Sequence, residues 1–323
     1  MPIYVKSARS AFDSARRHPS RHWSQAPLPG NVYDETREGQ GGFKAFSAFA
    51  DIIPENPVRL TRADRIFTIG SCFARNVEDA LEISGFEVLS RNPEVYPYSP
   101  GYLNRYNTPS MVRELELAKA GAQAYAGDSV IRHGEGFSDL TAYGLFSTRA
   151  EALDHRVKAI KLFEGIRRAT AVFITCGLSE VWYDRKLDAY LNVAPSRAFD
   201  DEPDRYEFRV LSYQDNVDGL RSLVESVRGL ANPGVKIVLT VSPVPLNATF
   251  LDRDVLISNT YSKAVLRAAI EQIVAEDSSI SYFPSYELVA LSDPGLVWHS
   301  DRRHVRQEFV NQIVIHFIRH YCA

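Results

Sequence analysis

The chain alternates short apolar runs with longer segments in which apolar residues return every three or four positions. Short runs rich in β-branched and aromatic residues are typical of buried strands, and the longer periodic segments are typical of helices that bury one face. Five strands are expected, at Arg65–Ile69, Phe86–Leu89, Ala171–Thr175, Val235–Val241 and Ile280–Phe283. Because strands and helices alternate, the pattern predicts an α/β fold with a mainly parallel five-stranded sheet covered by helices on both faces.

Helices are predicted between these strands. The first begins directly after Gly70-Ser71 and ends near Gly85, a residue type that often follows a helix C-terminus. The others are expected at Met111–Ala120 after a cap at Thr108 or Ser110, at Thr148–Arg168, after a cap at Asp215, at Ser258–Ala275, and in a last segment with Val310, Ile313, Val314 and Phe317 inward.

Three segments fall outside this alternation. Residues 1–64 are polar and rich in turn formers, so we expect an irregular N-terminal arm, with a short helix at Pro2–Arg17, before a main domain at 65–323. Two insertions into the domain are expected, at about 96–147 and 184–213. The first contains an irregular hairpin at 129–147, and the second contains alternating segments at Ala189–Val193 and Tyr206–Leu211.

The composition is that of a soluble globular protein, with 45% hydrophobic and 24% charged residues. A formal net charge of -3 argues against a nucleic-acid protein that depends on a basic surface. No apolar run approaches the roughly 20 residues that span a bilayer, and no apolar stretch follows the early charges as in a secretory signal. Cys72, Cys176 and Cys322 lack the spacing of a disulfide framework, so a cytoplasmic location is expected. A homo-oligomer stays open.

Gly70-Ser71 joins a predicted strand to a predicted helix. Such a turn places its side chain at the carboxyl edge of the sheet, beside the backbone N–H groups of the helix N-terminus. A serine there could attack an acyl group with donors ready for the oxyanion. The alternative is that Ser71 only caps the helix. Cys72 could replace it as nucleophile, although a buried side chain is the commoner fate of such a cysteine.

Asp301-x-x-His304 has the spacing of an acid–base pair in the first turn of the last helix. The carboxylate would hold one ring nitrogen and leave the other for Ser71. Alternatively, Asp301 is an N-cap and His304 a surface residue. A third interpretation makes His299, Asp301 and His304 metal ligands, but no second cluster of ligands accompanies them, so neither a metal nor a cofactor is expected.

The loop from Tyr96 to Pro109 is dense in tyrosine and proline. Tyrosine offers a flat apolar face with a polar tip, which suits stacking on a sugar or an aromatic ligand. The alternative is a packed surface loop.

Five motifs together resemble one family: Gly70-Ser-Cys-Phe-Ala74, Tyr106-Asn-Thr-Pro109, Gly177-Leu-Ser-Glu-Val-Trp182, Ser242-Pro-Val-Pro245 and Asp301-Arg-Arg-His304. Their order is similar to that of the GSCFA domain family, which is grouped with the SGNH (GDSL-like) hydrolases, and the resemblance covers about residues 40–310. It implies a flavodoxin-like three-layer α/β/α sandwich.

The resemblance also implies site residues. Ser71 matches the family's nucleophile, and Asp301 and His304 match its terminal Asp-x-x-His pair. Two motifs depart from the pattern. The first SGNH block is usually Gly-Asp-Ser, and the aspartate is missing here. The third is usually Gly-x-Asn-Asp, whereas Gly177-Leu-Ser-Glu180 puts Ser179 where the oxyanion-binding asparagine is expected.

A replacement for that asparagine is therefore needed. Asn107 is our candidate, because its amide can donate, although it could equally be a turn-forming residue before Thr-Pro. Tyr106 and Gly177 are further candidates for binding substrate or oxyanion. Glu180 would orient a helix or hydrogen-bond within the site.

These residues predict a serine esterase that removes an acyl group from an O-acylated carbohydrate or a related metabolite through an acyl-enzyme. The carbohydrate part rests on the family association and the tyrosine-rich loop. Two alternatives are an O-acyltransferase that uses the same Ser71, His304 and Asp301, and a non-catalytic carbohydrate-binding protein on the same fold.

Overall fold

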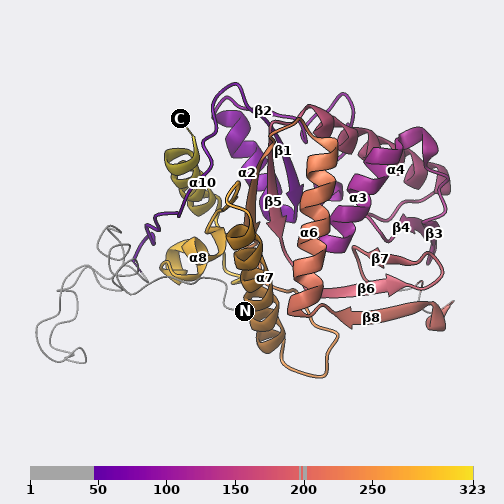
Figure 1. The fold of residues 1–323 in the computed structure, drawn as a ribbon. Helices are drawn as coiled ribbons and strands as arrows, with labels where there is room; N and C mark the ends of the chain where they lie inside the picture. The colour runs from indigo at the N-terminus through magenta and orange to yellow at the C-terminus, as the bar shows by residue number, and fades with distance from the viewer. Residues whose placement is uncertain (1–46, 196–197, 199–201, 323) are drawn as a thin grey trace, which may run out of the picture.

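The computed structural model describes residues 47–195, 198 and 202–322, so the helix expected at Pro2–Arg17 and most of the N-terminal arm lie outside the described residues. The core is a five-stranded, fully parallel sheet in the order β10-β9-β5-β1-β2 (Figure 1). The strands are β1 (Arg65–Gly70), β2 (Glu87–Val88), β5 (Ala171–Cys176), β9 (Lys236–Val241) and β10 (Ile280–Tyr282). The predicted α/β class and all five predicted strands are confirmed.

The strand order places a crevice beside β1. In chain order the five strands are arranged 2-1-3-4-5, the order of flavodoxin-like folds. The second strand lies on one side of β1 and the third, β5, on the other, with Ile66 opposite Ala171 and Gly70 opposite Thr175. The connections after β1 and β5 therefore leave in different directions, and open α/β sheets bind ligands at such a switch point.

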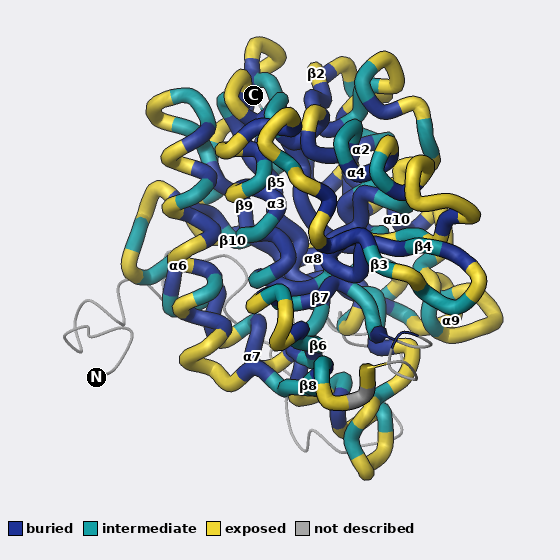
Figure 2. The backbone as a smooth tube through the Cα atoms, turned by 90° about the vertical axis from the view of Figure 1, so that its right-hand side faces the viewer, coloured by how far each residue is buried: buried dark blue, intermediate teal, exposed yellow. Residues whose placement is uncertain are grey.

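Helices cover both faces of the sheet. On one face, a core cluster joins β1, β5 and β9 to α3 (Thr108–Ala120), α4 (Arg149–Glu164), α6 (Tyr213–Leu230) and α7 (Val255–Glu276). On the other, a second cluster joins the sheet to α2 (Cys72–Ile83), α8 (Ser285–Ala290) and α10 (Gln307–Tyr321). The three layers follow from strands that are apolar on both sides. In Figure 2 the tube is dark blue along the central strands and yellow along the outer turns.

Two small antiparallel sheets lie beside the main one, the first within the expected insertion 96–147 and the second beginning at Glu180, before the expected start of the other insertion at residue 184. The hairpin is β3 (Val130–His133) with β4 (Gly136–Asp139). The second sheet has the order β7-β6-β8, with β6 at Glu180–Asp184, β7 at Ala189–Leu191 and β8 at Tyr206–Val210, and it lies at the lower right of Figure 1. The sequence pattern did not predict β6, because its side chains alternate only imperfectly between buried and half-buried.

Several helix starts differ from the prediction. Ser212 is the N-cap of α6, and Asp215 is the third helical residue, which closes a capping box with it. Asp254 caps α7 four residues before the expected Ser258. Asn107 caps α3, and α4 gives way to a 3₁₀ turn at Gly165–Arg168. At α3, α6 and α7 a side chain further upstream than expected accepts from the first N–H groups, whereas the difference at α4 is at its C-terminal end.

The described N-terminal segment, residues 47–64, runs along the C-terminal part of the chain. Ser47 forms a β-bridge with Ser292, and Leu60 forms one with Cys322. Of the helices that the structure describes, none combines the length and the apolar character needed to cross a bilayer.

Candidate active site

Ser71 occupies the turn between β1 and α2. It holds the N-cap position of α2, but its side chain makes no capping hydrogen bond. The side chain is 3% exposed, and Oγ donates instead to Ser242 Oγ at 3.1 Å. Ser242 follows the end of β9. The hydroxyl therefore lies over the carboxyl edge of the sheet. The side chain of an N-cap serine would instead accept a hydrogen bond from a backbone N–H in the first turn of the helix.

Gly70 makes this turn sterically feasible. Its φ is +152°, and a Cβ at this position would lie 2.6 Å from both the Cβ and the carbonyl oxygen of Thr175 on the neighbouring strand. Only glycine fits so close an approach of two backbones. The Gly-Ser pair is thus needed as a unit to place the hydroxyl.

The loop before α3 is fastened to the ends of both switch-point strands. The N–H of Arg105 donates to the Gly70 carbonyl at 2.8 Å, and the N–H of Leu178 donates to the Tyr106 carbonyl at 2.8 Å. A Cβ on Gly177 would lie 2.9 Å from the Tyr106 oxygen and 3.7 Å from Ser71 Cβ. Three motifs that are far apart in sequence therefore meet here. Gly177 N–H donates to no carbonyl or side chain of the described residues and lies next to Ser71.

Asp301 and His304 form the pair that their spacing predicts. Asp301 Oδ2 lies 2.5 Å from His304 Nδ1, and Oδ1 accepts from the N–H groups of Arg303 and His304 at 3.0 Å each. The side-chain hydrogen bond, aided by the two N–H groups, holds the pKa of Asp301 well below its usual range. The contact makes Nδ1 the protonated nitrogen and leaves Nε2 as the basic one.

The pair lies in a loop rather than in the first turn of α10, which corrects the predicted placement. The loop joins α9 (Pro294–Val297) to α10 and is closed by a bridge between Trp298 and Val305. Arg306, not Asp301, is the N-cap of α10. Asp301 instead caps its own turn, because its carboxylate takes the two N–H groups that a helix start would have offered.

His304 is not hydrogen-bonded to Ser71. Within the described residues, the Ser71 hydroxyl has Ser242 as its hydrogen-bond partner, and His304 Nε2 lies 3.4 Å from Arg303 Nη1. The loop packs on the same core cluster as α2, because Trp298 and Val305 lie against the cluster that contains Phe73. Burial raises the pKa of the Cys72 thiol, and the charge of Arg303 partly offsets that rise. The His304 side chain is 52% exposed, so it can turn without disrupting the core.

The other predicted residues serve the fold in this structure. Asn107 Oδ1 accepts from the N–H of Ser110 at 2.9 Å, and its Nδ2 donates to the Leu191 carbonyl at 3.1 Å. Ser179 bonds Ser262 on α7 through both its N–H and its hydroxyl, at 3.0 and 2.9 Å. An oxyanion contact from Asn107 would have to use its second amide hydrogen.

Glu180 also turns toward the loop before α7. Its Oε1 accepts from Thr249 Oγ1 at 2.8 Å, while Oε2 is buried with no hydrogen-bond partner among the described residues. Ser179 and Glu180 therefore anchor β6 to the region of α7.

Lys263 is the site residue that the sequence prediction missed. This α7 side chain is 1% exposed, and its Nζ donates to the carbonyls of Gly177 at 3.0 Å and Val244 at 2.8 Å. It thereby ties together the two loops that flank Ser71. Burial lowers the pKa of Lys263 to about 7, although the Cys72 and Cys176 thiols act in the opposite direction. The sequence feature that could have indicated its burial is its position three residues before Leu266, on the apolar face of α7.

The depressed pKa of Lys263 predicts a pH dependence of stability. Between about 7, the folded pKa, and 10.5, its ordinary value, the unfolded state binds more protons, so the free energy of unfolding should rise with pH. Lys263→Met removes this contribution. Between about pH 7.5 and 9.5 the wild type should gain about 2.5 kcal/mol relative to the variant, at no more than about 1.4 kcal/mol per pH unit. Urea unfolding at the two pH values measures the difference, and parallel pH profiles would show that Lys263 keeps its proton when folded.

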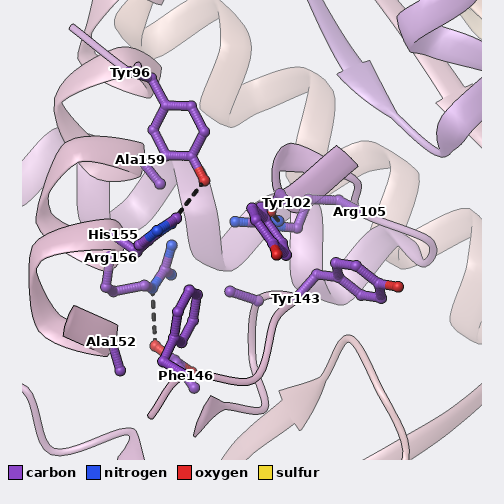
Figure 3. A pocket seen from close by; sticks show the side chains of 11 residues that line it. Tyr96, Tyr102, Arg105, Tyr143, Phe146, Ala152, His155, Arg156 and Ala159 are labelled. Atoms are coloured by element: carbon purple, nitrogen blue, oxygen red, sulfur yellow. Dashed lines mark hydrogen bonds and ion pairs between the residues drawn. The ribbon is translucent and has the colours of Figure 1, made fainter. Parts of the chain in front are cut away.

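A pocket opens next to this site (Figure 3). It is narrow: the space inside it that a water molecule can occupy is about 10 Å³, and its aromatic wall comes from Tyr96, Tyr102, Tyr143, Phe146 and His155. Tyr143 lies edge-on to Tyr106 with ring centroids 6.3 Å apart, which connects the aromatic wall to the loop beside Ser71. The tyrosine-rich loop is thus partly packed and partly pocket wall.

The floor of the pocket is a buried ionic network. Arg156 Nε donates to Asp139 Oδ2 at 2.8 Å, and Arg156 Nη1 donates to Glu114 Oε2 at 2.9 Å. Arg105 Nη2 lies 3.2 Å from the same Glu114 oxygen. These four side chains are at most 4% exposed. Arg105 Nε is buried with no hydrogen-bond partner among the described residues.

The fold and the site define an open, parallel α/β protein whose polar motifs gather at the carboxyl edge of its sheet, around a buried serine. More narrowly, the chain belongs to the GSCFA family, whose sequence model matches residues 65–317, from the first residue of β1 into α10. The search of curated proteins found no match.

Proposed function

We propose that this protein is a serine-dependent ester hydrolase of the SGNH type. The observation that carries the proposal is the Ser71 hydroxyl, which is buried at a helix N-terminus, makes no capping bond and lies beside Gly177. If Ser71 only capped α2, its hydroxyl oxygen would accept a hydrogen bond from a backbone N–H of the helix. The Asp301–His304 pair supplies an oriented base on a neighbouring loop.

The proposed reaction begins when His304 Nε2 takes the Ser71 proton and Oγ attacks the acyl carbon of the ester. Asp301 holds Nδ1–H and stabilises the imidazolium. The tetrahedral oxyanion would receive hydrogen bonds from the backbone N–H groups of Gly177 and Ser71, at the positive end of the α2 dipole. Collapse breaks the bond to the alcohol, which leaves with the proton from His304. Water then attacks the acyl-enzyme, gives a proton to His304 and releases the acid as Ser71 recovers its own.

This chemistry requires His304 to turn from Arg303 toward Ser71, and the exposure of its ring allows that movement. Catalytic hydrogen bonds are often long or misaligned before substrate binds. A substrate ester over Ser71 would also displace its contact with Ser242.

We infer an O-acylated carbohydrate as the substrate from the aromatic residues that line the pocket, which must widen to admit a sugar ring. Aromatic faces of Tyr102 and Tyr143 suit the apolar side of a sugar ring. The Nε–H of Arg105, buried without a hydrogen-bond partner among the described residues, would donate to a hydroxyl or carbonyl oxygen of a substrate that widens the pocket. The two arginines already face two carboxylates, Glu114 and Asp139, so the pocket has little net charge to attract a strongly anionic group. The cytoplasmic location, the homo-oligomer and the choice between hydrolysis and acyl transfer stay predictions.

A fluorophosphonate probe tests the central claim. The probe forms a stable phosphonyl ester only with an activated serine, so mass spectrometry of the labelled wild type should place the adduct on Ser71. Ser71→Ala should give no adduct, whereas Cys72→Ala, which removes the neighbouring nucleophile, should be labelled like the wild type. An unlabelled wild-type protein would favour a non-catalytic binding protein, and labelling that survives in Ser71→Ala would exclude this serine.

A further inference from the structure

A second cluster of polar side chains lies on α10, outside the candidate active site. His316 and His320 are four residues apart on one face of the helix, with ring centroids 4.5 Å apart. Asp51, from the N-terminal segment that runs along α10, faces them. One ligand atom from each of the three side chains lies within 4.8 Å of the other two.

His316 has an unused ring nitrogen that points at this cluster. The residue is 2% exposed, and its Nε2 lies 2.7 Å from the Ile52 carbonyl. A carbonyl can only accept, so Nε2 carries the hydrogen and Nδ1 carries the lone pair. Nδ1 is buried, makes no hydrogen bond to the described residues, and lies 3.4 Å from Asp51 Oδ1.

An ion pair between Asp51 and a protonated His316 explains this arrangement less well. Burial lowers the pKa of His316, and neighbouring His320 lowers it further, although the Ile52 carbonyl and Asp51 act in the opposite direction. Burial also lowers the pKa of His320. Both rings are therefore neutral near pH 7, and two neutral imidazoles beside a carboxylate lack a cation.

We propose that Asp51, His316 and His320 bind a divalent transition-metal ion, with Zn²⁺ as the best match. Zinc takes nitrogen and carboxylate ligands at about 2.0–2.2 Å, so two ligand atoms of a tetrahedral site lie about 3.4 Å apart. The distance from His316 Nδ1 to Asp51 Oδ1 is 3.4 Å. A ligating histidine usually donates its other ring N–H to a carbonyl or carboxylate, as His316 does to Ile52. Water would complete the coordination.

The neighbouring charges bear on this site in two ways. The positive charges of Arg319 and Arg59 help to lower the pKa of His320, and Arg59 Nη1 donates to the His320 carbonyl at 3.0 Å. The two arginine charges repel a bound metal ion, and the negative charge of the Asp51 carboxylate offsets this repulsion. They also favour the neutral imidazoles that metal binding requires.

The metal would have a structural role. It would cross-link the segment that carries Asp51 to α10, where the Phe49 ring already packs at 5.6 Å from the His316 ring and 5.5 Å from Phe309. The cluster lies toward the C-terminal end of α10, where Cys322 forms a β-bridge with Leu60. The Asp301–His304 loop precedes the opposite, N-terminal end of the helix. Ester hydrolysis should therefore not depend on this metal.

Titration of the untagged, EDTA-treated full chain with ZnCl₂ tests the proposal. Isothermal calorimetry should give one site, and Zn²⁺ at about 100 times Kd should raise the Tm by several degrees, because the ion binds the folded state. Asp51→Asn and His320→Gln change exposed or half-exposed side chains, so their metal-free Tm should stay near that of the wild type. Each should weaken Zn²⁺ binding by more than about tenfold.

His299→Ala is the matched control, because it removes a histidine of the other candidate metal cluster. It should bind Zn²⁺ like the wild type and show the same rise in Tm. Co²⁺ should give the visible absorption of a tetrahedral site in the wild type and lose it in Asp51→Asn. The proposal is overturned if the wild type binds no Zn²⁺, or if Asp51→Asn and His320→Gln bind it as tightly as the wild type.

Discussion

Replacing Ser71 with alanine is expected to lower the turnover of a short-chain aryl ester by about 10⁴-fold or more. The loss follows because no acyl-enzyme can form without Oγ, and binding and oxyanion contacts alone recover only a small part of the rate. The fold should survive, because the hydroxyl gives up a single hydrogen bond, to Ser242. Release of the aryl alcohol measures kcat, and the Tm reports the fold.

The same assay of aryl-ester turnover, applied to His304 variants, tests whether His304 is the general base for Ser71. The two residues are not hydrogen-bonded to each other in this structure. His304→Ala should lose about as much activity as Ser71→Ala, and the double variant should be no slower than the slower single variant, because residues that act as one unit are not additive. His299→Ala, which removes a nearby imidazole, is the control and should keep its turnover. Full activity in His304→Ala would end the proposed partnership. An equal loss in His299→Ala would point instead to the alternative in which His299, Asp301 and His304 hold a metal.

The sequence was most informative where burial dominates. The central strands β1, β5 and β9 are buried on both faces, so they appear as short apolar runs with near-correct ends. Helix starts were less predictable, because several polar residues compete to cap each one. At α6 both Ser212 and Asp215 take part, and the sequence alone does not say which residue begins the helix.

The site was predictable only where its chemistry is local. Asp301 and His304 are three residues apart, and a single turn brings them together. Contacts across long sequence separations were not predictable: Ser242 lies 171 residues from Ser71, and Lys263 lies 86 residues from Gly177. Such partners are set by the place of β9 in the sheet and by the packing of α7 against the sheet, and the local sequence around a serine or lysine does not reveal either.

Removal of Glu114 is expected to give the largest loss of stability. Its carboxylate lies between Arg105 and Arg156 with no exposed surface, so Glu114→Ala would leave two buried cations with only Asp139 to balance them. Breaking a buried ion pair from one side costs about 3–5 kcal/mol. Urea unfolding should show this decrease, and Glu116→Ala, an exposed position on the same helix, should stay within about 0.5 kcal/mol of the wild type.

The expected pH dependence has a definite sign. Burial alone would raise the pKa of Glu114, but the two guanidinium groups outweigh it and hold the pKa below its ordinary value. The unfolded carboxylate therefore binds a proton first as the pH falls, so the stabilisation present at neutral pH is lost in acid as the pH approaches the folded pKa. Glu114→Ala should flatten this part of the pH–stability profile.

The Glu114→Ala substitution should also make Arg105 more mobile. Because the backbone N–H of Arg105 donates to the Gly70 carbonyl, kcat should fall in the protein that remains folded. A Glu114→Ala protein as stable as Glu116→Ala would mean that water reaches both arginines and that the pocket floor is open.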